Sequence, residues 1–133
     1  MPLTARIRVR TYELDSFGHV NNAVYLQYFE EARSEYLLQL GLSFEDFART
    51  QTQFVITEAR VRYVSSARYG DELLITGEIE SAGPATVLFT YKVTRDSTLI
   101  AEGETRGAFL SAATGRPIRT PEPFKSAFAP KTS

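Results

Sequence analysis

Residues 23–40 carry the only long helical pattern in the chain, and this segment constrains the fold more than any other. Apolar residues recur there every three or four positions, the spacing of one helix face: Tyr25, Tyr28, Phe29, Ala32, Tyr36 and Leu40. Further apolar residues widen that face: Val24, Leu26, Leu37 and Leu38. Asn21 or Asn22 can cap the start, and Gly41 is typical of a helix end. The pattern predicts a helix that is covered on most sides.

Alternation of apolar and polar residues predicts strands on both sides of this helix. The predicted strands are residues 5–12, 53–64, 72–81, 85–95 and 98–110, and a short helical turn is expected at 43–49 after a Ser43 cap. In the second strand we expect one face to hold Val55, Thr57, Ala59, Val61 and Tyr63. Gly103 and Gly107 share a face of the last strand, which indicates a close approach by another element such as the helix.

Short loops join the last four strands, so we expect a mainly antiparallel five-stranded sheet in a single α+β domain, residues 1–133. Strands of this length predict a curved sheet wrapped around the central helix. An edge strand then stays unpaired, and self-association into a homodimer or homotetramer is the simplest remedy. Residues 121–133 are rich in proline and predict a partly loose tail, in which a turn at 124–128 can pack.

Composition excludes several classes of site. The chain has no cysteine and one histidine, which rules out disulfides, thiolate metal sites, a cysteine nucleophile and a multi-histidine metal site within one chain. We therefore expect no metal and no cofactor. A formal net charge of −1 gives no electrostatic case for nucleic acid. No apolar run is long enough to span a membrane, and the first residues do not resemble a signal peptide, so we expect a cytoplasmic protein.

The stretch before the helix is unusually polar. Asp15 follows a strand pattern, a turn is expected around Gly18, and Asn21 and Asn22 lead into the helix. A carboxylate beside a helix N-terminus could hydrolyse an activated acyl group, because free N–H groups stabilise a developing oxyanion. The competing interpretation is a loop aspartate that accepts hydrogen bonds from its own backbone, and spacing alone favours this commoner role.

Residues 12–33 as a block resemble the signature of hotdog-fold acyl-CoA thioesterases of the 4-hydroxybenzoyl-CoA thioesterase type. The long-chain acyl-CoA thioesterase branch is the most similar. The shared residues are Leu14-Asp15 before the turn, then His19-Val20-Asn21-Asn22-Ala23, then Glu30-Glu31-Ala32-Arg33 on the helix. A looser similarity continues at Tyr63, Ala67 and Gly70-Asp71-Glu72-Leu73. The resemblance implies a hotdog fold, with a sheet curved around one helix.

The resemblance also implies an activity, hydrolysis of acyl-CoA to free acid and CoA. Asp15 would act as nucleophile or as general base, and the backbone at Asn22 and Ala23 would hold the thioester oxygen. Gly18 and His19 would help to position the substrate. The active site would lie between two subunits. This reading makes Asp15 catalytic rather than a plain loop residue.

Substrate-binding residues are implied less specifically. The acyl chain would enter along the helix, where Tyr25 and Phe29 are candidates for its pocket, although both also suit a core. Plausible partners for the CoA phosphates are Arg60, Arg62, Arg68 and Arg119. Their default role is that of solvated surface residues.

Three positions depart from the family pattern. Glu13 stands where many members carry an aspartate, Asn22 stands where one branch has a histidine, and Ser66 stands where many relatives have a proline. The second departure weakens any transfer of a catalytic histidine to this chain.

Two other functions remain open on the same fold. One is a non-catalytic module that binds or senses acyl-CoA, although an intact Asp15 counts against it. The other is an enoyl-thioester hydratase, but such enzymes use a histidine on or beside the central helix, and residues 23–40 contain none. Glu31 and Glu58 are weaker catalytic candidates.

Overall fold

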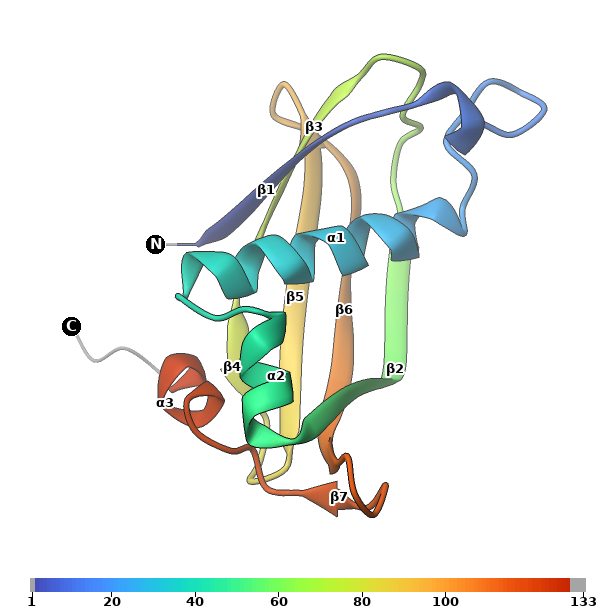
Figure 1. Ribbon diagram of the computed structural model, residues 1–133. Coiled ribbons are helices and arrows are strands. Elements are labelled where there is room, and N and C mark those ends of the chain that lie inside the picture. Colours follow the sequence, from blue (N-terminus) through green and yellow to red (C-terminus); the bar gives the residue numbers. More distant parts are fainter. Residues whose placement is uncertain (1, 130–133) are drawn as a thin grey trace.

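The computed structural model describes residues 2–129, and its framework is one antiparallel sheet crossed by one long helix (Figure 1). The strand order is β1-β3-β5-β6-β2, and β4 and β7 are short additions paired with β5 and β6. The strands are β1 Leu3–Arg8, β2 Thr52–Tyr63, β3 Glu72–Gly77, β4 Ile79–Ser81, β5 Thr86–Arg95, β6 Thr98–Ser111 and β7 Pro117–Ile118. The helices are η1 Thr11–Glu13 (3-10), α1 Val24–Gln39, α2 Phe44–Thr50 and α3 Phe124–Phe128. The predicted α+β arrangement and helix are thus confirmed.

One stripe of α1 is buried against the sheet. Its buried residues are Tyr25, Tyr28, Phe29, Ala32 and Tyr36. Phe29 stacks on Tyr91 of β5, with ring centroids 4.1 Å apart. A Cβ on Gly103 of β6 would lie 2.8 Å from the Phe29 ring, so the expected close approach of the helix at this glycine is confirmed. At Gly107 the close neighbour is instead Phe54 of β2.

The prediction that α1 is covered on most sides is wrong for one protomer. Leu26 is 42% exposed and Leu38 is 57% exposed. Both lie away from the buried stripe, and the sheet contacts only one side of the helix (Figure 1). The outer side of α1 therefore stays open unless another molecule covers it.

Three predicted strands differ from the observed ones, two in their bounds and the third in which of its residues share a face. The strand expected at 5–12 is β1, which ends at Arg8, because Glu13 accepts bonds from Arg10 and folds residues 11–13 into η1. The segment 72–81 is divided into β3 and β4, where Gly77 comes too close to the backbone of β5 to carry a side chain.

In β2 a register shift between Ile56 and Glu58 breaks the expected alternation. Phe54 before the shift packs on Phe89 and Phe109, whereas Tyr63 after it packs on Tyr25 of α1. The residues on the helix side therefore change from even to odd numbers along the strand. The prediction of one continuous face from Val55 to Tyr63 is wrong for this reason.

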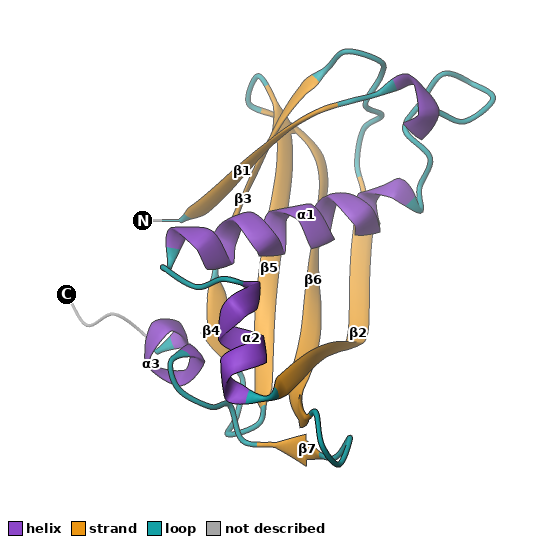
Figure 2. Ribbon diagram, in the orientation of Figure 1, coloured by secondary structure: helices purple, strands orange, loops and turns teal. Residues whose placement is uncertain are grey.

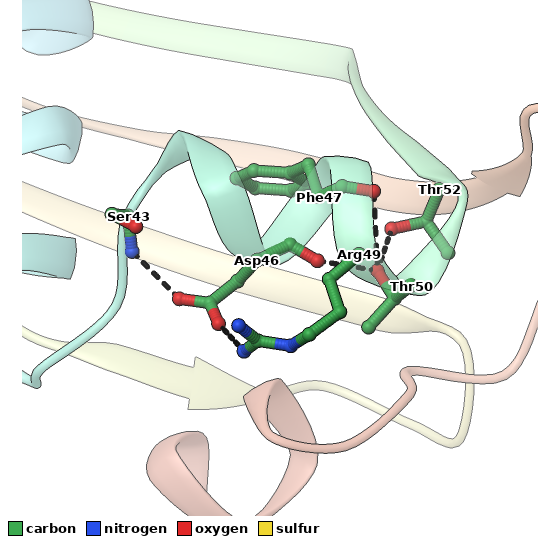
Figure 3. Close-up of polar contacts among 6 residues, drawn as sticks. All are labelled: Ser43, Asp46, Phe47, Arg49, Thr50 and Thr52. Atoms are coloured by element: carbon green, nitrogen blue, oxygen red, sulfur yellow. Dashed lines mark hydrogen bonds and ion pairs between the residues drawn. The ribbon is translucent and has the colours of Figure 1, made fainter.

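Helix α2 is tied to the start of β2 by polar contacts (Figure 3). Asp46 is 6% exposed, and its carboxylate accepts from the Ser43 N–H at 2.9 Å and pairs with Arg49. The Thr50 hydroxyl donates to the Asp46 carbonyl at 2.7 Å and lies 2.8 Å from the Thr52 hydroxyl. The expected Ser43 start of this helix is confirmed.

The C-terminal segment packs as far as it is described. Phe124 and Phe128 of α3 are buried, and Phe124 contacts Phe47 of α2 with ring centroids 4.7 Å apart. The turn expected at 124–128 is thus a helix that belongs to the core. The end of the expected loose tail, residues 130–133, lies outside the described residues.

The two edges of the sheet differ. On β1, the Gln39 side chain of α1 accepts from the Thr4 N–H at 3.1 Å and donates to the Thr4 carbonyl, so an amide occupies the backbone groups that a further strand would use. On β2, the long edge opposite β6 has no partner strand within residues 2–129. Within residues 2–129, β2 is the longer of the two edge strands, and it lacks a side chain that plays the part of Gln39. Among residues 2–129, no helix is long and apolar enough to cross a membrane.

Candidate active site

Asp15 lies at the start of a tight turn between two bridged residues, Leu14 and Val20. The Gly18 N–H donates to the Asp15 carbonyl at 3.1 Å, and the Asp15 N–H donates to the His19 carbonyl at 2.7 Å. Gly18 has φ +80°, which explains glycine at the end of this turn. The carboxylate Oδ1 accepts from the N–H groups of Phe17 and His19, at 2.9 and 3.2 Å. The side chain is exposed, and Oδ2 accepts no hydrogen bond within residues 2–129.

The turn is docked onto the loop between β2 and β3, and both loops lie at the same end of the molecule (Figure 2). The Val20 N–H donates to the Ala67 carbonyl at 2.9 Å, and His19 bridges to Arg68. Asp71 holds that loop by accepting from the Arg68 N–H and from Arg95, at 2.9 and 2.7 Å. Burial pushes the pKa of Asp71 up, but these bonds outweigh burial and hold that pKa below its usual value.

Four of the predicted site residues line one cleft of about 190 Å³: Asp15, His19, Asn22 and Tyr25. Tyr63 of β2 and the serines 65 and 66 of the following loop complete its wall. The sequence therefore located residues that the fold brings together. Gly18 and Ala23 belong to the adjoining backbone and do not line the cleft.

The start of α1 leaves one N–H group free at this cleft. The Ala23 N–H donates to the Asn21 side chain at 2.9 Å, and the Val24 N–H donates to the Asn21 carbonyl at 2.9 Å. Asn21 thus serves the helix start, as expected of one of the two asparagines. Within residues 2–129, the Asn22 N–H has no hydrogen-bond acceptor. The Asn22 carbonyl accepts from the Tyr63 hydroxyl at 2.9 Å, which fixes the following Asn22–Ala23 peptide against β2.

The two acyl-pocket candidates lie in different places. Tyr25 is 2% exposed yet reaches the cleft, and it packs edge-on against Tyr28 and Tyr63 with centroids 5.7 and 5.4 Å apart. Burial raises the pKa of its hydroxyl, so Tyr25 contributes an uncharged side chain to the wall of the cleft. Phe29 is fully buried on Tyr91 and lines no cavity described for residues 2–129.

The four arginine candidates do not form one patch. Arg60 and Arg62 of β2 pair with Glu104 and Glu102 of β6, the first at 3.7 Å. Arg68 is exposed beside the Asp15 turn. Arg119 follows β7, at the opposite end of the sheet from that turn (Figure 1). None of the four lines the cleft, but Arg68 is bridged to His19, which does. Glu58, a weaker catalytic candidate, lies 3.7 Å from Arg106 and lines neither cavity.

A second, larger cavity of about 340 Å³ lies between α1, α2 and the first half of β2. Its deeper wall is aromatic and aliphatic: Leu37, Phe47, Phe54, Phe89, Phe109 and Phe128. Glu30, Arg33 and Ser34 of α1 also line it, together with the exposed residues Gln53 and Ile56 of β2. Arg33 donates to the Tyr91 hydroxyl at 3.3 Å, rather than pairing with Glu30. The sequence did not indicate this cavity, because its walls come from segments far apart in the chain.

The role of Glu13 was also missed from the sequence, because this residue was considered only as a departure from a family pattern. Glu13 is 4% exposed, and its carboxylate accepts from Tyr28 and Arg10. A glutamate in an otherwise strand-like segment, three residues after an arginine, was the available signal. Tyr63 could not have been placed, because the register shift in β2 decides which way it points.

The arrangement suits acyl chemistry without a metal ligand set. Within residues 2–129, no group of three or more His, Cys, Asp or Glu side chains could hold a metal ion. The model of the family described as the thioesterase-like superfamily matches residues 9–128. The chain belongs to this superfamily. The hotdog fold and the resemblance seen in residues 12–33 are thereby confirmed.

Individual members of the thioesterase-like superfamily are similar over most of the chain. The chloroplast acyl-acyl carrier protein thioesterase ATL3 of Arabidopsis thaliana is 32% identical over 92% of this chain, which spans 65% of that protein's length. The long-chain acyl-CoA thioesterase FadM of Escherichia coli is 32% identical over 69% of each chain. The structure of the hypothetical protein TT1821 from Thermus thermophilus superimposes with a TM-score of 0.88 at 30% identity, covering 95% of this chain and 96% of that one.

Proposed function

We propose that this protein hydrolyses acyl-CoA thioesters to the free acid and CoA, with Asp15 as the catalytic carboxylate. One observation carries the proposal: Asp15 and Asn22 line the same cleft, and within residues 2–129 the Asn22 N–H has no acceptor. A carboxylate and an oxyanion donor are the two groups that thioester hydrolysis needs. The thioesterase activities of ATL3 and FadM support the same reaction class.

Each group has a separate task in this reaction. The thioester oxygen accepts from the Asn22 N–H, which stabilises the negative charge that develops on it by about 3 kcal/mol, the scale for one well-placed donor. Asp15 uses its free Oδ2 to attack the carbonyl carbon, or to take a proton from an attacking water. The C–S bond then breaks, and the CoA thiolate leaves and takes up a proton. Along the first route, water hydrolyses the acyl-Asp15 anhydride and restores the carboxylate.

We further propose that two copies of the chain build each site. Tyr63 and Val64, at the end of β2, line the Asp15 cleft, whereas Gln53 and Phe54, at its beginning, line the apolar cavity. Antiparallel pairing of two β2 edges would set the end of one strand beside the beginning of the other. The cleft of one copy would then face the cavity of its partner. This pairing would also bring the partner close to the exposed Leu26 in the first turn of α1.

The acyl group in this arrangement is aliphatic and its carrier is CoA. A cavity of about 340 Å³ with an aromatic and aliphatic wall suits a long apolar chain. Arg68, next to the cleft, is placed to meet a phosphate of the carrier. Because ATL3 is an acyl-acyl carrier protein thioesterase, an acyl carrier protein is the alternative carrier.

The test is release of free thiol from a panel of acyl-CoAs and acyl-acyl carrier proteins of increasing chain length. Asp15→Asn removes the charge while keeping the shape, and we expect a loss of at least a hundredfold, the scale for a catalytic acid, base or nucleophile. Asp96→Asn, an exposed residue of the β5–β6 turn, is the matched control and should keep full activity.

Three outcomes would overturn parts of this proposal. Equal rates for wild type and Asp15→Asn would exclude Asp15 as the catalyst. Binding of acyl-CoA without hydrolysis would favour the non-catalytic module. Turnover restricted to acyl carrier protein thioesters would replace CoA as the carrier.

A further inference from the structure

We propose that Glu13 is a positioning residue, whose buried carboxylate holds the Asp15 turn in register with the start of α1. The proposal rests on the function assigned to Asp15 above. Glu13 itself is enclosed below the turn and does not line the cleft. It would act on the reaction only through the placement of Asp15 and Asn22.

Glu13 contacts three separate parts of the site. Its Oε1 accepts from the Tyr28 hydroxyl in α1 and from the Arg10 N–H, both at 2.8 Å. Its Oε2 accepts from the Arg10 guanidinium at 3.0 and 2.6 Å. Its backbone carbonyl accepts from the Asn21 N–H at 2.9 Å. One residue therefore joins the entry to the turn, the exit from the turn and the buried side of the helix.

The two proposed reacting groups lie just beyond these contacts. Asp15 is two residues after Glu13, and Asn22 directly follows Asn21. Both residues are exposed, and local bonds hold each of them within its own turn. The bonds of Glu13 join these two turns at the base of the loop, so they help to set the spacing between Asp15 and Asn22. Displacement of a reacting group by about 1 Å can cost about a hundredfold in rate. Loosening Glu13 should therefore lower kcat even when the fold survives.

A residue that only stabilised the fold would not need to carry a charge at the buried position of Glu13. Buried carboxylates are costly, and apolar replacements of buried ion pairs are often neutral or stabilising. The carboxylate accepts four hydrogen bonds in fixed directions, which an apolar side chain could not do. Directional bonds suit a residue that sets a position.

The experiment measures kcat and KM for a long-chain acyl-CoA in wild type, Glu13→Gln and Tyr28→Phe, at a temperature where all are folded by circular dichroism. We expect kcat to fall at least tenfold in Glu13→Gln and less in Tyr28→Phe, which removes one bond. The matched control is Asp46→Asn, which also removes a buried capping carboxylate but lies in α2. It should lower the melting temperature and keep kcat within about twofold.

A double-mutant cycle separates positioning from a general loss of stability. If Glu13 acts through the placement of Asp15 and Asn22, then Glu13→Gln should cost much less in the Asp15→Asn background than in wild type. Equal kcat in wild type and Glu13→Gln, or independent losses that multiply, would overturn the positioning role while leaving the function of Asp15 intact. Absence of turnover in wild type would instead overturn the proposed function.

Discussion

Two carboxylates two residues apart have opposite environments in this protein. Asp15 is exposed on a turn and keeps one oxygen free, whereas Glu13 is enclosed and bonded through both oxygens. Burial alone would raise the pKa of Glu13, but the bonds from Arg10 and Tyr28 hold that pKa below its ordinary value. Burial and the bond to Glu13 raise the pKa of the Tyr28 hydroxyl. Asp15 is therefore available to react, whereas Glu13 is held in place by its hydrogen bonds.

The lowered pKa of Glu13 makes a contribution to stability that depends on pH. A carboxyl whose pKa is lower in the folded state stabilises the fold fully above its unfolded value, about 4.3, and loses that contribution as the pH falls through the folded value. We therefore expect the difference in melting temperature between wild type and Glu13→Gln to be constant from pH 7 to about 5 and to shrink at lower pH.

Thermal melts at a series of pH values check this expectation. The exposed residue Glu80 of β4 provides the control, since Glu80→Gln should leave the pH profile of wild type unchanged. A difference between wild type and Glu13→Gln that stays the same down to pH 3 would contradict it.

At the scale of elements, the glycines of β6 let the helix and sheet meet closely. A methyl group on Gly103 would lie 2.8 Å from the Phe29 ring, and it would also press on the Arg60 carbonyl. Because backbone on one side and a packed ring on the other cannot both yield, Gly103→Ala should reduce the free energy of unfolding by about 1–3 kcal/mol. Urea unfolding measures this loss. Thr98→Ala, exposed in the same strand, should change stability by less than about 0.5 kcal/mol, and equal losses in both variants would refute the argument.

The main elements could be predicted from the sequence because their periodicity is strong. The tyrosine stripe at 25–36, the alternation at 85–95 and the positive φ angles at Asp96 and Ser97 each agree with the local pattern. The failures occur where tertiary contacts override that pattern. Glu13 draws residues 11–13 out of the strand, and a register shift in β2 reverses which residues face the helix.

The site was predictable only in part. Asp15, His19, Asn22 and Tyr25 lie close in the chain, so one local block placed them together. The apolar cavity combines α1, α2, β2, β5, β6 and α3, and no local pattern indicates such a combination. The free N–H at Asn22 depends on which carbonyls its neighbours reach, which only coordinates can decide.

At the scale of the whole molecule, several open features lie at or near β2. The β2 edge has no partner strand within residues 2–129, whereas on the β1 edge Gln39 occupies the backbone groups of Thr4. The outer side of α1 exposes Leu26 and Leu38. The end of β2 lines the cleft, and the first half of the same strand lines the apolar cavity. The proposed second copy, paired along β2, would account for the open strand edge, for Leu26 and for both hollows, whereas Leu38 lies at the β1 end of α1.

The central claim is that Asp15 of one copy acts on a thioester whose acyl chain lies in the cavity of its partner. The decisive measurement uses a heterodimer, purified with two different tags, of an Asp15→Asn chain and a Ser34→Trp chain. Ser34 lines the cavity, and a tryptophan there should block it. The account predicts that each parent dimer is inactive and that the heterodimer, with one intact site of two, hydrolyses long-chain acyl-CoA at about half the wild-type rate. A heterodimer as inactive as its parents would contradict the account.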